Sequence, residues 1–187
     1  TAGLAVTPIV NVINNSVSLL ATNAGLTFAR AFQYQGTNPA SVNCYHNTFR
    51  LGGSGAGTTG NPASIAVAKS NSSTAGSFVF INNICINTRT GAANPHVGYW
   101  NSQATAGVNT SDHNTIYGPV FGAIVGGFYQ GTTAAYRTAS FPNEQNSVFG
   151  LIDFNNNLDP VVNLNGPNTS GGKLAGTPLT AVPRDIY

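Results

Sequence analysis

The stretch Phe80-Ile81-Asn82-Asn83-Ile84-Cys85 places two asparagines between two short apolar runs, and similar segments recur along the chain. Five of them align on one Asn that is followed, two positions later, by an apolar residue. The aligned residues are Asn15, Asn47, Asn83, Asn114 and Asn146, with Val17, Phe49, Cys85, Ile116 and Val148. Successive asparagines are 32, 36, 31 and 32 residues apart. A near-constant period of this length indicates one structural unit stacked on copies of itself.

Each repeat has room for two or three short strands joined by polar turns. Gly and β-branched residues are frequent and Met is lacking, which disfavours a helical repeat. We therefore predict an all-β fold, a right-handed parallel β-helix (solenoid) of about five coils with a period of 31–36 residues. A β-propeller, with four strands in each blade, is the architectural alternative.

The two aligned columns have different expected roles. The Asn column suits a turn between strands, because Asn tolerates left-handed backbone and its amide bonds locally. Stacked amides also hydrogen-bond to one another along a solenoid. The apolar column is expected to form a stack inside the coils.

The repeat divides the chain into three parts. Residues 1–10 are apolar, uncharged and outside the repeat, so they are expected to cap the first coil or to lie on a neighbouring subunit as an added strand. Residues 11–157 form the coils, and residues 158–187 form a terminal strand and an exit segment. The chain begins at Thr1 without a signal segment, so we expect a processed piece of a longer protein.

Charge is unusually sparse, at 6% of residues with a net charge of +2 and no basic run. This composition argues against nucleic-acid partners and against membrane insertion. Sparse charge also leaves the open ends of a solenoid unprotected against pairing, so we expect self-association. Cys44 and Cys85 lie five positions out of register in adjacent coils, which predicts free thiols and not a disulfide.

One carboxylate pair is a candidate for catalysis. Asp112 and Glu144 both lie two residues before the aligned Asn in adjacent coils, which would place them about 4.8 Å apart. A retaining glycosidase uses a separation of roughly 5 Å. The alternative is a pair of exposed turn residues, and we favour it because stacked polar side chains are common in solenoids.

A second candidate is a calcium loop, in which oxygen-bearing side chains occupy alternate positions. Leu158 stands where an EF-hand loop needs Gly, so the match is partial, and a polar turn is the alternative. The candidate ligands are Asp153, Asn155, Asn157 and Asp159. Calcium is the one cofactor that the sequence suggests.

Aromatic residues offer a carbohydrate interpretation. An exposed aromatic row would stack on sugar rings, whereas buried aromatics would serve packing. The candidates are Tyr34, Tyr99, Trp100, Tyr129 and Tyr136.

A family resemblance is carried by segments 11–20, Ile81 to Gly91, Asp112-His113-Asn114 with Tyr117, Asn143 to Ser147, Leu158 to Pro160 and Gly176 to Pro178. They resemble the right-handed β-helix repeats of large surface proteins from Bacteroidetes- and Ignavibacteria-like bacteria, which are often exported by a type IX secretion route. The resemblance implies an extracellular or cell-surface location and brings no catalytic residues.

These observations favour a non-enzymatic extracellular structural protein, a β-helix subunit of a cell-surface or filamentous assembly. The alternative is a carbohydrate-binding or polysaccharide-cleaving β-helix protein of the pectate-lyase kind, with a surface polysaccharide as its partner.

Overall fold

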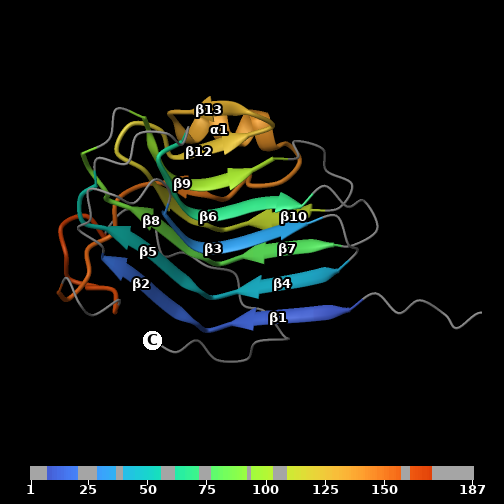
Figure 1. Cartoon of the computed structure of the whole chain (residues 1–187), viewed down its shortest axis with the longest axis horizontal. Helices are drawn as coiled ribbons and strands as arrows, with labels where there is room; N and C mark the ends of the chain where they lie inside the picture. The colour runs from blue at the N-terminus through green and yellow to red at the C-terminus, as the bar shows by residue number, and fades with distance from the viewer. Residues whose placement is uncertain are drawn as a thin grey trace, which may run out of the picture.

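The computed structural model describes residues 8–20, 29–36, 40–55, 62–71, 77–91, 94–102, 109–156 and 161–169. Over these residues the chain is a parallel β-solenoid with one short helix, which confirms the predicted fold class (Figure 1). Neighbouring strands are parallel, apart from the last pair of one sheet.

Three sheets build the walls of the solenoid, and strands of successive coils lie next to one another in each sheet. Sheet A contains β1 (Ile9–Ile13), β4 (Ser41–Tyr45), β7 (Phe78–Ile81) and β10 (Asn109–Asp112). Sheet B contains β2 (Ser16–Leu20), β5 (Thr48–Gly52), β8 (Ile84–Asn87), β11 (Thr115–Tyr117) and β14 (Val148–Phe149). Sheet C contains β3 (Ala29–Gly36), β6 (Ser64–Asn71), β9 (His96–Asn101), β12 (Ala123–Val125) and β13 (Phe128–Gln130).

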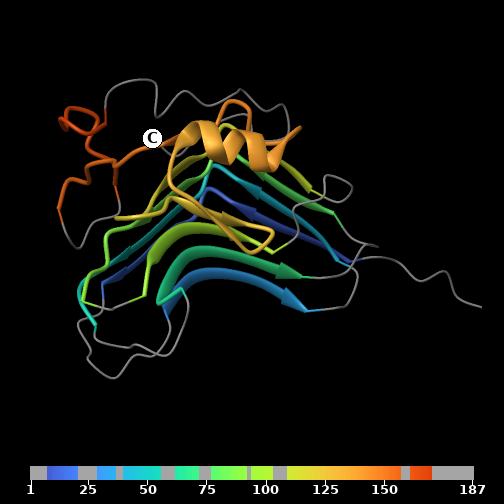
Figure 2. The same ribbon diagram turned by 90° about the horizontal axis from the view of Figure 1, so that it is seen from above.

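The number of coils is smaller than predicted. In the first three coils every strand has at least four residues. A fourth coil, made of β10, β11 and β12, is shorter, because β11 and β12 have three residues each. Strand β12 then turns back into the antiparallel strand β13, and helix α1 (Thr133–Ser140) follows. Figure 2, which looks down the stack, shows this helix lying over its end. The last repeat of the sequence therefore belongs largely to a cap.

The first coil begins earlier than predicted. Ile9 and Val10 pair with β4 as part of β1, although they fall in the segment expected to lie outside the repeat. Residues 1–7 of that segment lie outside the described residues. The expected boundary after residue 157 also lies outside them, because residues 157–160 are not described.

The apolar column lies inside the solenoid for four of its five members. Val17, Phe49, Cys85 and Ile116 stand in register on sheet B, and the last three are almost fully buried. The prediction for the last coil is wrong by one residue, because Ile116 pairs with Phe149, and Val148 pairs with Thr115.

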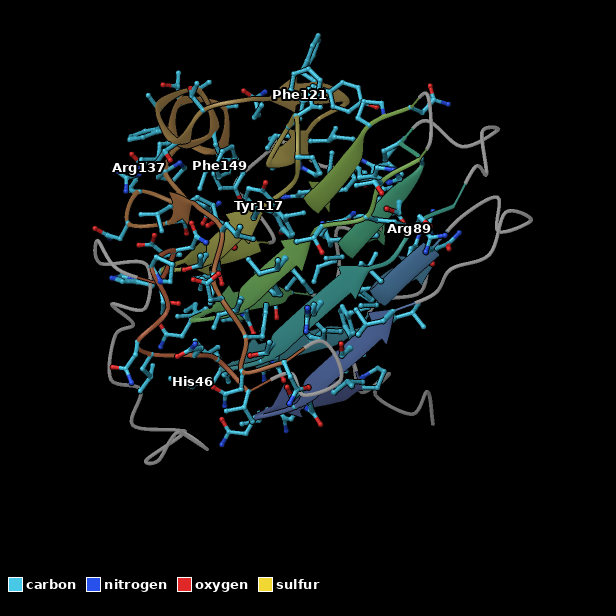
Figure 3. The ribbon with its side chains drawn as sticks, turned by 90° about the vertical axis from the view of Figure 1, so that its left-hand side faces the viewer. His46, Arg89, Tyr117, Phe121, Arg137 and Phe149 are labelled. Atoms are coloured by element: carbon cyan, nitrogen blue, oxygen red, sulfur yellow. The ribbon has the colours of Figure 1, made fainter. Side chains whose placement is uncertain are left out.

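Stacked aromatic rings fill the interior beside that column. The centroids of Phe78 and Phe80 are 5.5 Å apart, and those of Phe80 and Tyr99 are 5.2 Å apart. Tyr136 of helix α1 closes the stack with its ring edge-on to Tyr99 and 5.0 Å from Phe149. Figure 3 shows Phe149 close to the helix. Such rings contribute packing area and a preferred geometry.

The chain after β14 covers the outer face of sheet B. Ile152 packs against Ile86, and the guanidinium of Arg50 lies 4.4 Å from the ring centroid of Phe154. The same guanidinium donates a hydrogen bond of 3.1 Å to the carbonyl of Asn156. This segment therefore shields a sheet face that a bare solenoid would expose.

The bend between sheets A and B uses left-handed backbone. In the first four coils the left-handed residue is the one before the aligned Asn, with φ between 54° and 60°. Our expectation that the aligned Asn itself adopts this backbone is wrong. The left-handed residues are Asn14, His46, Asn82 and His113.

Candidate functional site

The aligned asparagines form a hydrogen-bonded ladder along the corner between sheets A and B. The backbone N–H of Asn47 and its side-chain amide both donate to Oδ1 of Asn83, at 3.0 and 2.9 Å. Asn83 donates in the same way to Asn114, at 2.9 and 3.2 Å. Asn15 does so to Asn47, at 2.9 and 3.1 Å. In each of these Asn–Asn bonds, the donor lies in one coil and the acceptor lies in the next coil toward the C-terminal end.

The ladder is buried and its amides also bind the backbone. Asn47, Asn83 and Asn114 are each about 1% exposed, whereas Asn15 at the first coil is exposed. The amide of Asn83 donates to the carbonyls of Cys44 and Ile81, at 3.1 and 3.0 Å. Because buried polar groups are costly when unpaired, this double use of each amide fixes the register of one coil on the next.

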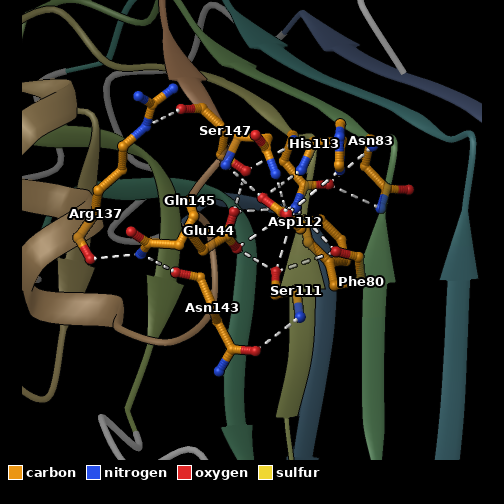
Figure 4. A network of polar contacts seen from close by, with 12 residues as sticks. Phe80, Asn83, Ser111, Asp112, His113, Arg137, Asn143, Glu144, Gln145 and Ser147 are labelled. Carbon is orange, nitrogen blue, oxygen red and sulfur yellow. Dashed lines mark hydrogen bonds and ion pairs between the residues drawn. The ribbon is translucent and has the colours of Figure 1, made fainter. Parts of the chain in front are cut away.

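The ladder ends at a buried carboxylate, that of Glu144, which is 2% exposed (Figure 4). The amide of Asn114 donates to it at 3.2 Å, and the hydroxyls of Ser111 and Ser147 donate to its two oxygens. Ser147 in turn accepts the backbone N–H of Asn114 at 2.8 Å. The donor end of the ladder thus meets an acceptor-only group.

The fifth ladder position therefore belongs to Ser147, and our prediction of Asn146 is wrong. Asn146 is exposed, and its backbone and side chain donate to the carboxylate of Asp112, at 2.7 and 2.8 Å. The bend in this coil also differs, because the left-handed residue is Glu144. Because the chain bends at a different position in this coil, β14 pairs with β11 one residue out of the register that the repeat predicts.

The buried position sets the charge behaviour of Glu144. Burial raises the pKa of this carboxyl, and the hydrogen bonds from Ser111, Ser147 and Asn114 oppose the rise only in part. Burial and then the charge of Glu144 raise the pKa of the hydroxyls of Tyr99 and Tyr136. A group with these surroundings completes a polar network and is shielded from solvent.

Asp112 lies in the opposite environment, on the outer surface and about a quarter exposed. Burial alone would raise its pKa, but the hydrogen bonds from Asn146 and His113 and the charge of His113 lower it. Its carboxylate lies 3.4 Å from the ring nitrogen Nδ1 of His113.

The register predicted for the candidate catalytic pair is therefore wrong. The favoured alternative, two exposed turn residues, is also wrong for Glu144, which is buried. Glu144 stands beside Ser111, whose carbonyl accepts its backbone N–H, and not beside Asp112. Since successive side chains of a strand point to opposite faces, Ser111 and Glu144 face inward and Asp112 faces outward. The two carboxylates therefore lie on opposite faces of the solenoid wall.

The described residues of the candidate calcium loop, Asp153 and Asn155, are hydrogen-bonded to the chain that follows the loop. The carboxylate of Asp153 accepts the backbone N–H of Asn168 at 2.8 Å and its side-chain amide at 2.9 Å. The backbone N–H of Asn155 donates to Val161 at 3.0 Å. Asn157 and Asp159 lie outside the described residues. Within the described ranges, no group of three or more His, Cys, Asp or Glu side chains gathers.

A second buried polar cluster, which sequence reasoning missed, joins sheets B and C. The hydroxyl of Ser64 lies 2.8 Å from Nδ1 of His96, and the amide of Asn87 donates to that hydroxyl at 2.9 Å. Ser64 and Asn87 are fully buried. Burial first, and then the charge of Arg89, lower the pKa of His96. The one sequence signal for this cluster was the spacing of 32 residues between Ser64 and His96, which equals the repeat period and places them side by side.

The aromatic candidates do not make one exposed row. Tyr99 and Tyr136 are fully buried, and Tyr34 stacks on the buried ring of Phe78. Trp100 and Tyr129 pack partly buried against another cluster. Cys44 and Cys85 are free and buried, and burial raises the pKa of Cys44 to about 12.

Comparisons with protein-family models, with curated proteins and with solved structures returned no match. In the described part of the chain, no helix has the length and apolar character needed to cross a membrane.

Proposed function

We propose that this chain is a non-enzymatic extracellular structural protein, a β-solenoid subunit of a cell-surface assembly that self-associates through its first coil. One observation carries the proposal. Strands β1, β2 and β3 each lie at the edge of a sheet and have no partner strand on their outer side among the described residues. Unpaired edge strands are templates for pairing with another chain.

The chemistry of the edge supports this proposal. Charged side chains are a common device against edge pairing, and Arg30 is the one charge in the three strands. The apolar side chains Ile9, Val10 and Leu19 are exposed there. An edge with a single charge and exposed apolar side chains favours association in water.

The extracellular and bacterial part of the proposal rests on the sequence resemblance. A charged fraction of 6% and a surface rich in Asn, Ser and Thr agree with a structural protein. The buried position of Glu144 also favours a non-enzymatic role, because a carboxyl shielded by Ser111, Ser147 and Asn114 is not available to a substrate.

A carbohydrate-binding protein is the second candidate, and one observation favours it. The outer corner between sheets A and B presents Tyr45 beside the polar column of His46, Asn82 and His113. Polar groups repeated at the coil spacing would suit an extended polysaccharide. Binding of soluble polysaccharides to the Tyr45→Ala variant and to the unchanged protein would test this candidate.

Sedimentation of the full chain over a wide concentration range tests the main proposal. We expect a monomer at low concentration and a larger species at high concentration, with electron microscopy showing its shape. A monomer at every concentration would contradict the proposal.

A further inference from the structure

The two ends of the solenoid offer different chemistry to a second copy of the chain. At the first coil, the edges of all three sheets lack a partner strand within the described ranges. At the other end, the donors of the Asn ladder are taken by Glu144, and helix α1 with Tyr136 covers the core. Strands β10, β14 and β13 are also outermost in their sheets, but there the backbone N–H of Glu144 bonds to the carbonyl of Ser111 in β10, and helix α1 contacts β12 and β13. Within the described residues, a second copy therefore finds open strands at the first coil and a covered surface at the last.

We infer that two copies meet first coil to first coil about a two-fold axis, as a closed pair and not as a filament. This inference rests on the proposed function and names the partner as a second copy. A contact between two identical edges closes on itself, whereas a filament needs two different complementary ends. Two first coils related by such an axis run antiparallel, which satisfies strand hydrogen bonding.

The lengths of the strands suit this symmetry. Strands β1 and β2 each contain five residues on either side of the bend at Asn14 and Asn15, and β3 contains eight. An axis through this bend and the middle of β3 exchanges β1 with the partner's β2. The same axis pairs β3 with its own copy.

The side chains match in the same arrangement. Val12 and Val17 stand at equal distances from the bend, and both pack toward the core. Val10 and Leu19 form the next equidistant pair, and both lie over buried residues of the second coil. Val10 is 47% exposed and Leu19 39%, so pairing each with the other from the partner would remove both from water.

Strand β3 matches itself when Gln33 lies on the axis. Phe32, which packs toward the core, then faces the partner's Tyr34, which does the same. Arg30 lies near the end of the strand, so the two positive charges are kept apart. Gln33 is exposed, and its position on the axis gives the inference a direct test.

The test is disulfide formation by the Gln33→Cys variant of the full chain. Opposite residues in an antiparallel pair have Cα atoms about 4.5 to 5.5 Å apart, within the range of a disulfide. The native thiols Cys44 and Cys85 are buried and give little background. We expect a covalent pair that reduction separates. The matched control is Ala134→Cys, which is also exposed but lies on helix α1 at the capped end, and it should form far less.

Sedimentation separates the outcomes. A species that stops at two chains, and that Leu19→Lys weakens at least tenfold, supports the inference. Species that grow with concentration, or a pair in which Gln33→Cys fails to cross-link, leave the proposed function standing and overturn the two-fold pair. A monomer at all concentrations overturns both. Cross-linking does not depend on the Leu19→Lys variant, so a folding defect of that variant leaves the inference testable.

Discussion

The first and last coils of this solenoid are built from the same sequence pattern, yet they end in different ways. The first coil leaves Asn15 exposed and its strands unpaired on one side, within the described residues. The last coil turns β12 back on itself, lays helix α1 over the core and buries a carboxylate beneath it. A repeat alone has no end, so the end must be built by residues that depart from the repeat.

The cap is held to the last coil by polar and aromatic contacts together. The side chain of Arg137 donates to the carbonyl of Ser147 at 3.0 Å, and Gln145 donates to the carbonyl of Arg137 at 2.9 Å (Figure 4). Tyr136 supplies the apolar contact. Loss of the Tyr136 ring should therefore lower the free energy of unfolding more than any single substitution at the first coil.

The largest effect is expected for Tyr136→Ala. Removal of a fully buried aromatic ring should lower the free energy of unfolding by about 3 to 5 kcal/mol. Urea unfolding followed by circular dichroism measures the loss. Phe128→Ala is the control, because Phe128 is 75% exposed, and its effect should stay within about 0.5 kcal/mol. Equal losses for the two variants would show that the cap does not pack as described.

The ladder gives the next comparison, between a buried member and the exposed one. Asn83→Ala removes the acceptor of the buried backbone N–H of Asn47 and the side-chain donor to the carbonyl of Cys44, and should cost about 3 kcal/mol. Asn15→Ala should cost about 1 kcal/mol, because water reaches the edge. Thermal and urea unfolding of both variants measure the difference. A larger loss for Asn15→Ala would contradict an open first coil.

A smaller effect is expected at the start of helix α1. The hydroxyl of Thr132 accepts the backbone N–H of Ala135 at 3.2 Å, so Thr132→Ala should cost about 1 kcal/mol. Thr138→Ala is the matched control, because its hydroxyl bonds within the helix and Ala favours helix. If both variants unfold at the same urea concentration, the cap does not depend on this hydrogen bond.

The smallest effects concern pH, and the two carboxylates should differ in sign. The pKa of Glu144 is raised, so its contribution to stability is greatest below the ordinary value of 4.5 and falls as pH rises through the folded pKa. The pKa of Asp112 is lowered, so its contribution is present above the ordinary value of 3.8 and is lost as pH falls through the folded pKa.

The free energy of unfolding, measured from about pH 3 to about pH 8, separates these contributions, because this range extends to both sides of the ordinary carboxyl pKa values. Glu144→Gln should remove the decline above pH 4.5, and Asp112→Asn should weaken the decline in acid. A pH profile that neither substitution alters would mean that neither carboxyl has the surroundings described here.

Much of the fold could be predicted because stacked coils repeat their side chains in register. The spacing of Asn15, Asn47, Asn83 and Asn114 led to the solenoid, and these four residues hydrogen-bond in that order. The last repeat misled, because Asn146 looks like its predecessors while Ser147 takes the position beside Asn114. A one-residue shift exchanges the two faces of a strand, and local sequence similarity does not report it.

The candidate site was predictable only in part. The sequence identified Asp112 and Glu144 as the carboxylates nearest the repeat, but it placed them in one column. Their environments depend on which face of the strand each one occupies and on helix α1, which lies over Glu144. The buried cluster of Ser64, Asn87 and His96 carries no local motif, because its members come from three strands.

The sequence by itself determined the parallel stacking, the period and the chemical character of the columns, because each follows from residues repeated at a fixed spacing. Only the tertiary structure decided which end is closed and which carboxylate is buried. Both depend on contacts of the cap with the last coil, among them those of Tyr136 with Tyr99 and Phe149, which no repeat encodes.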